Sequence, residues 1–169
     1  RRDARSRGHE DVVVLEGIVG QHEALARRAG DLELVARLGV ADEVGAFAEG
    51  DLAAAIESMT TLNKAAAATL PDFQVHACTD VTGFGLLGHL VEMAKASAVD
   101  VQLTLSAIPL LDGTRETIAA GFLSSLQPQN FRLRRAVANV EEAAAGEGRY
   151  LALFDPQTAG GLLASVPAE

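Results

Sequence analysis

The residues best suited to chemistry stand together in one short segment of the chain. Asp80 supplies a carboxylate, and three glycines follow it at Gly83, Gly85 and Gly88. A β-branched, apolar run at residues 74–79 precedes the aspartate, and apolar residues at helical spacing follow the glycines. The pattern predicts a strand that delivers a carboxylate and a glycine-rich turn to the start of a helix.

This arrangement suits a phosphate group held through a metal ion. The amide groups at the start of a helix attract anions, and glycines let a ligand come close to the backbone. A carboxylate beside a phosphate would repel it unless a cation lay between them. Mg²⁺ is the usual mediator, because it is commonly bound by one or two carboxylates together with phosphate oxygens. Asp80 is therefore a candidate Mg²⁺ ligand.

Two other interpretations of the same segment stay open at this point. Residues 83–88 match G-x-G-x-x-G, the dinucleotide fingerprint, which requires its first glycine directly after the strand and an acidic residue about 20 positions later. Three residues intervene here, and residues 103–106 contain no acid, so this interpretation is the weaker one. The other is a plain strand–turn–helix in which the glycines only permit tight packing.

The segment at residues 76–89 also resembles the signature of the selenophosphate synthetases (selenide, water dikinases). Part of the similarity lies in a linking region typical of members fused to an oxidoreductase, and part in a D-P-Q-T-S-G-G-L segment in which Ala159 replaces the serine. The agreement spans about residues 50–169, the family's C-terminal domain. Besides the signature, the matching segments are residues 56–64, 124–130, 132–135 and 153–163.

The resemblance implies a function. The family, which is similar to aminoimidazole ribonucleotide synthetases, converts ATP, selenide and water to selenophosphate, AMP and phosphate with Mg²⁺. Asp80 matches the one metal-ligating aspartate of its C-terminal half, and Gly83 and Gly85 match backbone neighbours of the nucleotide. The catalytic Cys or selenocysteine and Lys belong to an N-terminal domain whose motifs are not found here. That domain is the implied partner, in a homodimeric enzyme.

The resemblance divides the chain into two parts. Residues 51–169 are expected to form the synthetase C-terminal domain, shortened at its C-terminal end. Residues 1–50 are expected to be a divergent or incomplete N-terminal segment, in which residues 32–41 keep only remnants of the family's L-x-L-T-K-P-L-G-T-G stretch. Two alternatives remain: a non-catalytic remnant or interaction domain, and another enzyme of the same ATP-binding superfamily.

Composition narrows the class of protein. The chain has 169 residues, a length typical of one domain. Apolar residues make up 49% and aromatic residues only 4%, which predicts an aliphatic core. A net charge of −9 argues against nucleic acid and against an anionic membrane surface as partners. With no apolar run of about 18 residues and no apolar stretch after the basic start, a cytoplasmic domain is expected.

Strand and helix patterns alternate along the chain, which predicts an α+β (α/β-like) fold. The family implies a mostly antiparallel sheet covered by helices on one side. The expected strands are residues 11–15, 73–79, 99–105, 150–154 and 161–166. The expected helices are residues 21–28, 32–38, 52–69, 84–97, 113–120 and 131–145.

Most other polar residues have a structural interpretation. Cys78 lies in an apolar strand, where a small buried hydrophobe is expected. His89 is expected to pack on a helix, and Asp155 to stabilise a turn before a proline. Gly160 and the glycine after it predict a tight backbone approach. The expected solvated cations are Lys64, Arg132, Arg134 and Arg135.

Overall fold

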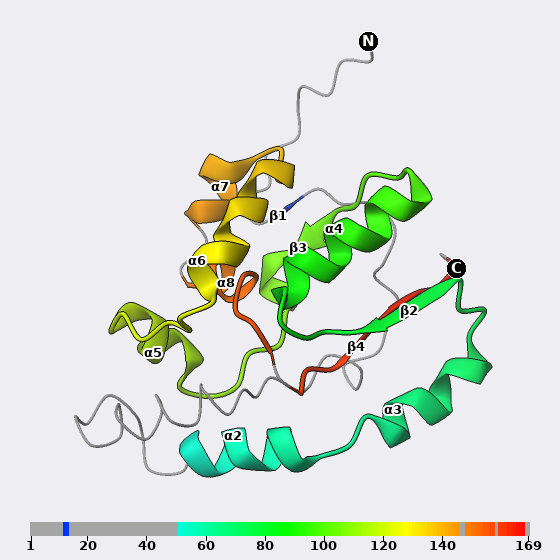
Figure 1. Ribbon diagram of the computed structural model, residues 1–169, viewed down its shortest axis with the longest axis horizontal. Helices are drawn as coiled ribbons and strands as arrows, with labels where there is room; N and C mark the ends of the chain where they lie inside the picture. The colour runs from blue at the N-terminus through cyan, green and yellow to red at the C-terminus, as the bar shows by residue number, and fades with distance from the viewer. Residues whose placement is uncertain (1–11, 14–50, 146–147, 158, 168–169) are drawn as a thin grey trace.

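The computed structural model describes residues 12–13, 51–145, 148–157 and 159–167 (Figure 1). Short helices alternate with two antiparallel strand pairs, so the predicted α+β class is confirmed. The N-terminal elements are β1 (Val12–Val13), α2 (Asp51–Thr60), α3 (Lys64–Thr69), η1 (Leu70–Asp72), β2 (Ala77–Asp80) and α4 (Gly85–Ser97). The following elements are β3 (Leu103–Thr104), η2 (Leu105–Ala107), α5 (Thr114–Ala119), α6 (Gln127–Asn130), η3 (Phe131–Ala136), α7 (Val140–Ala144), α8 (Arg149–Ala152) and β4 (Leu162–Ser165).

The strand pair β2–β4 positions the start of the signature segment. The two strands lie side by side and antiparallel, with β4 returning along β2 from much later in the chain (Figure 1). Asp80 is the last residue of β2 and stands opposite Leu162, the first residue of β4. One more backbone bond, from the Val81 N–H to the Gly161 oxygen at 2.8 Å, extends the pairing beyond the strand. The position of Asp80 is therefore fixed by its partner strand.

Helix α4 is the centre of the hydrophobic core. Its buried side chains pack against residues from η2, η3, α7 and α8, and Figure 1 shows α4 crossing the molecule between the β2–β4 pair and the later helices. The core is largely aliphatic, as predicted, but it also holds three aromatic rings in edge-to-face contact, with centroids 4.9–6.4 Å apart. The rings belong to Phe131, Tyr150 and Phe154. Burial of this surface is the main force that holds the helices together.

Several predicted elements are confirmed. The helix expected at residues 84–97 is α4, the helix expected at residues 113–120 contains α5, and the strand expected at residues 161–166 contains β4. The strand expected at residues 11–15 contains β1. The helices expected at residues 21–28 and 32–38 lie outside the described residues.

The helix predicted over residues 52–69 is wrong in one respect, because it is broken into α2 and α3. Two threonines explain the break. The Thr60 hydroxyl donates to the Ile56 carbonyl at 3.0 Å, and the Thr61 hydroxyl donates to the Glu57 carbonyl at 2.6 Å. Such side-chain bonds to the preceding turn compete with the helical backbone and often bend or end a helix.

The strand predicted at residues 150–154 is wrong, because these residues form α8 and the turn after it. Tyr150, Leu153 and Phe154 are the buried residues of this segment, and their spacing is helical rather than alternating. The helix predicted at residues 131–145 is also wrong in part, because η3 ends at Ala136 and α7 begins at Val140. The packing of Tyr150 and Phe154 in the aromatic cluster favours the helical form of the first segment.

The strands predicted at residues 73–79 and 99–105 are present but short. The first is reduced to β2 and the second to β3, which passes directly into η2. Among the described residues, none of the helices is both long enough and apolar enough to pass through a membrane.

The fold generates a prediction about two neighbouring glycines. Gly85 has φ +69°, and a Cβ there would lie 2.9 Å from the Leu153 oxygen and 3.0 Å from the Asp155 oxygen. Gly85→Ala should therefore lower the free energy of unfolding by about 2–4 kcal/mol, because it adds backbone strain and overpacking. A Cβ on Gly83 would meet nothing within 4 Å, so Gly83→Ala should change stability by less than about 0.5 kcal/mol. Thermal or urea unfolding measures both, and equal losses would contradict the structure.

Candidate functional site

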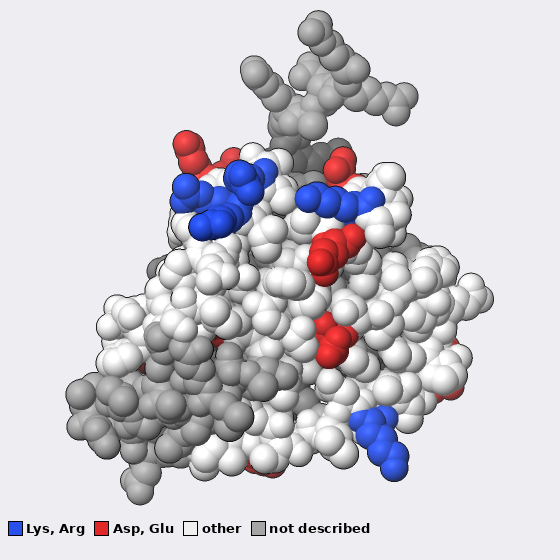
Figure 2. Space-filling view, in the orientation of Figure 1, with Lys and Arg blue, Asp and Glu red and all other residues white. Residues whose placement is uncertain are grey.

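Asp80 lies on an open face of the β2–β4 pair. Side chains alternate along β2, so Ala77 and Thr79 are half-buried while Cys78 and Asp80 are exposed. None of the described residues donates a hydrogen bond to the Asp80 carboxylate. Figure 2 shows acidic side chains over α4 and the end of β2, and basic side chains gathered over α6 and α7. The carboxylate is therefore available to a ligand from outside the chain.

The turn between β2 and α4 is held by its backbone. The Thr82 carbonyl oxygen accepts two N–H groups, from Gly85 at 2.9 Å and from Gln157 at 3.0 Å. The Leu87 N–H donates to the Leu153 oxygen at 3.0 Å. The turn is thus bound to the chain segment between α8 and β4, which passes directly against it.

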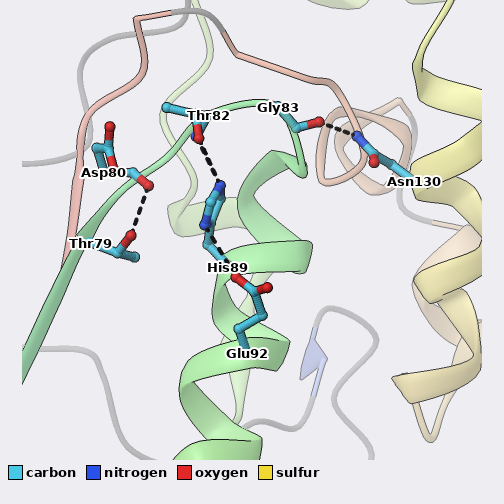
Figure 3. A network of polar contacts seen from close by, with 7 residues as sticks. All are labelled: Thr79, Asp80, Thr82, Gly83, His89, Glu92 and Asn130. Atoms are coloured by element: carbon cyan, nitrogen blue, oxygen red, sulfur yellow. Dashed lines mark hydrogen bonds and ion pairs between the residues drawn. The ribbon is translucent and has the colours of Figure 1, made fainter.

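His89 supports the turn from below, as Figure 3 shows. The residue is only 7% exposed, so the predicted helix-packing role is confirmed. The sequence did not predict its hydrogen bond, in which the Thr82 N–H donates to the His89 Nε2 at 3.0 Å. The other ring nitrogen, Nδ1, lies 3.7 Å from a carboxylate oxygen of Glu92.

Asn130 at the end of α6 supports the turn from the other side (Figure 3). It is 7% exposed, and its Nδ2 donates to the Gly83 oxygen at 2.8 Å and to the Phe154 oxygen at 3.0 Å. Sequence reasoning missed this residue, although it ends the segment at residues 124–130 that resembles the family. No spacing rule joins it to Gly83, because the two lie 47 positions apart.

The glycines around the turn are required for different structural reasons, except for Gly83. Gly85 is buried and close to backbone atoms, and a Cβ on Gly88 would lie 2.5 Å from the Phe84 Cβ. A Cβ on Gly160 would lie 2.0 Å from the Val81 oxygen, which confirms the predicted tight approach. Gly83 alone is exposed, has no positive φ and has open space around it. Neither conformation nor packing within the described residues requires a glycine at that position.

The backbone N–H groups that have no acceptor show where the turn could bind an anion. The Gly85 and Leu87 N–H groups are already bonded to Thr82 and Leu153 oxygens, so part of the start of α4 is occupied by the protein itself. The N–H groups of Gly83 and Phe84 have no acceptor among the described residues, and both residues are exposed. An anion would therefore meet the turn rather than the first turn of the helix.

The described residues do not form a metal site by themselves. No group of three or more His, Cys, Asp or Glu side chains in the described part of the chain is arranged to hold a metal ion. Asp80 fits the more limited role predicted for it, since Mg²⁺ usually takes one or two carboxylates and completes its shell with phosphate oxygens and water.

The remaining polar residues play structural or solvated roles. The Asp155 carboxylate accepts the Gln157 side-chain amide at 2.7 Å within its own turn. Lys64 and the three arginines of η3 are exposed, as predicted. Arg134 stacks over the Phe131 ring at 4.9 Å. These contacts give the basic residues ordinary surface roles.

The prediction that Cys78 is a buried hydrophobe is wrong, because its side chain is exposed. The two-strand pair leaves this face of β2 open, and Cys78 shares the face with Asp80. Partial desolvation is the larger cause that raises the pKa of the thiol above its ordinary value of 9.0, and the negative charge of Asp80 raises it further.

Comparison with known proteins gives a consistent result. Residues 12–169 match the family described as AIR synthase related protein, C-terminal domain. A selenide, water dikinase of Geobacter metallireducens is 41% identical over 116 residues, which is 69% of this chain and 33% of that protein. The dikinase of Clostridioides difficile is 41% identical over 118 residues, or 68% of this chain and 32% of that protein.

A longer match is found with the selenide, water dikinase of Bdellovibrio bacteriovorus. It is 37% identical over 153 residues, which is 89% of this chain and 42% of that protein. The chain thus spans about a third to two fifths of the length of these relatives.

The exposure of Cys78 generates a second prediction. Iodoacetamide should alkylate Cys78 in the folded protein, at pH 8 more slowly than a free thiol, because the raised pKa lowers the thiolate fraction. Asp80→Asn should accelerate the reaction severalfold by removing the nearby negative charge, while desolvation keeps it slower than the free thiol. Mass spectrometry measures the rate, with Asp100→Asn as the exposed control. Labelling only after denaturation would contradict the structure.

Proposed function

This chain belongs to the AIR synthase related protein family, through its C-terminal domain, and from that premise we propose that it serves as the C-terminal domain of a selenide, water dikinase. The proposed reaction converts ATP, selenide and water to selenophosphate, AMP and phosphate. The proposal rests mainly on the exposed Asp80 carboxylate, which stands directly before the glycine turn held by backbone bonds. None of the described residues forms a hydrogen bond with this carboxylate. The similarity to the named dikinases supports the choice of reaction.

In this proposal Asp80 contributes one carboxylate ligand to the Mg²⁺ that accompanies ATP. Mg²⁺ bound there would supply charge neutralisation for the phosphate groups during transfer. The carboxylate would be held in position by β2, because the backbone on both sides of Asp80 is bonded to the β4 strand and to Gly161. The ligand set would then include groups from outside the described residues, which hold no group of three or more metal-binding side chains.

Gly83 and Gly85 take different parts in the same proposal. Gly83 offers an exposed amide and no side chain, so a phosphate or sugar could lie directly against the backbone. Gly85 is buried beneath the segment after α8, so its part is to let that segment support the turn. Gly83 would contact the nucleotide directly, whereas Gly85 would lie near it and support the turn.

Catalysis itself is proposed to depend on the part of the enzyme that precedes this domain. The partners would be ATP, selenide, an N-terminal catalytic domain and, in the intact enzyme, a second copy. We also propose that the boundary of the domain lies near residue 51. The domain would have a mostly antiparallel sheet covered by helices on one side, in a cytoplasmic protein.

A second candidate is a non-catalytic interaction domain. The observation that favours it is that the described residues hold no group of three or more metal-binding side chains. The two candidates differ in whether Asp80 affects nucleotide chemistry, so one substitution separates them.

The proposal predicts the effect of Asp80→Asn. In the chain joined to the preceding domains of a selenide, water dikinase, selenide-dependent AMP release should fall by about 10- to 100-fold, since even groups that only support metal ligands have effects of that size. Stability should stay unchanged, because the carboxylate is exposed. Asp100→Asn, another exposed aspartate, is the matched control. Equal AMP release by Asp80→Asn and the wild type would leave the interaction domain as the better account.

Gly83→Ala tests the backbone contact separately from the metal. The methyl group meets open space within the chain, so the folded protein should be as stable as the wild type. It would project toward the proposed nucleotide, so the dissociation constant for Mg²⁺·ATP should rise about tenfold in the same joined enzyme. Isothermal titration measures it. Unchanged affinity would show that the Gly83 backbone is not a nucleotide contact.

A further inference from the structure

Buried polar side chains hold the peptide groups on both sides of the Thr82–Gly83 peptide. His89 on α4 accepts the Thr82 N–H of the preceding peptide, and Asn130 on α6 donates to the Gly83 oxygen of the following peptide. Both side chains are 7% exposed. Neither bond belongs to a helix or a strand ladder.

The chemistry of the His89 bond is determined by its donor. A backbone N–H can only donate, so the His89 Nε2 must carry a lone pair and accept. The ring proton then stands on Nδ1, on the side of Glu92. The Thr82 hydroxyl also lies 3.2 Å from the same Nε2. The imidazole is thus a neutral acceptor under the turn, and its contact with Glu92 favours this tautomer.

The orientation of Asn130 is determined in the same way. Two carbonyl oxygens, of Gly83 and Phe154, lie within 3.0 Å of its Nδ2. If the amide were rotated, its own oxygen would face both carbonyls and be repelled. Both protons of the Asn130 amide are therefore used, and they join the turn to the end of the segment that follows α8.

Burial of these two side chains has an energetic cost that apolar residues of similar size would avoid, because polar groups lose water on burial. Their hydrogen bonds offset this cost only while the turn keeps its present conformation. The two residues therefore specify one conformation of the turn more than they add stability. That conformation leaves the Gly83 and Phe84 N–H groups exposed and without an acceptor among the described residues.

We propose that His89 and Asn130 are positioning residues, which fix the peptide groups before Thr82 and after Gly83, so that the Gly83 amide between them stands ready for an anionic oxygen of the ligand beside Asp80. The assignment rests on the proposed function for the identity of the ligand, and on the geometry of the turn for the role of the two side chains. They act through the backbone and do not touch the ligand.

Three variants of the ¹⁵N-labelled chain test the role of His89. His89→Leu should make the Thr82 amide exchange with solvent about tenfold faster, while the amides of the α4 core keep their rates. His89→Gln should stay within about threefold of the wild type, because its carboxamide oxygen can take the place of Nε2 as acceptor. His76→Leu, at an exposed histidine, is the matched control and should change nothing at Thr82.

The role of Asn130 is tested by Asn130→Asp. This variant places acceptor oxygens against the Gly83 and Phe154 carbonyls and should also speed amide exchange in the turn.

A measurement on the wild type needs no variant: the Thr82 nitrogen and the His89 Nε2 should show scalar coupling across their hydrogen bond. Absence of that coupling, or equal Thr82 exchange in His89→Leu and the wild type, would overturn the proposal. So would a His89→Gln variant that exchanges as fast as His89→Leu.

Ligand binding by the joined enzyme separates positioning from a merely structural role. Mn²⁺·ATP, a paramagnetic probe, should broaden the Gly83 amide signal, with a dissociation constant about tenfold higher in His89→Leu and near the wild type in His89→Gln. If the probe binds but affinity is equal in all three proteins, positioning is overturned. If the wild type shows no broadening at all, the proposed function fails, and so does the role of His89 and Asn130 in preparing the Gly83 amide for a ligand. The exchange rates then still decide whether the two side chains hold the turn.

Discussion

The close contact of residues 80–87 with residues 153–157 and 159–161 is the constraint on which the site depends. These segments lie far apart in the chain, and closing the loop between them has an entropic cost that local contacts do not have. Burial of Leu87 and Phe154 offsets that cost, and both side chains are fully buried. Three backbone bonds then fix the alignment: Val81 to Gly161, Gln157 to Thr82 and Leu87 to Leu153. Two glycines, Gly85 and Gly160, allow the backbones to come close enough.

The parts of the fold that depend on short-range patterns could be predicted from the sequence. Helix α4, strand β4 and the strand end at Asp80 follow from apolar periodicity and from the glycines between them. Within the candidate site, the place of Asp80 before its glycine turn could be predicted, while its role as a metal ligand stays a prediction. The contacts of His89 and Asn130 could not, since no periodicity links Asn130 to a carbonyl oxygen 47 positions away. That contact exists only because α6 packs beside the turn.

The incorrect predictions also have a common physical origin. Residues 150–154 are a continuous apolar run, and such a short run does not distinguish a strand from a helix. The packing of Tyr150 and Phe154 on Phe131 decides the conformation. The exposure of Cys78 follows from the β2–β4 pair, which leaves one face open. Apolar composition around a residue predicts burial only when another layer covers that face, and a sequence pattern does not contain this information.

The structure separates two glycines that the sequence treats alike. Gly85 is explained completely by the chain itself, through its positive φ and the carbonyls beside it. Gly83 is not, and neither is the exposed carboxylate of Asp80. These two features stand at one end of β2, where the protein has fixed the backbone with buried polar side chains. A domain that offers one carboxylate and a few amides supplies only part of a binding site. Its contribution to affinity then depends on keeping those groups in place before the ligand arrives, because ordering them on binding would reduce the free energy of association.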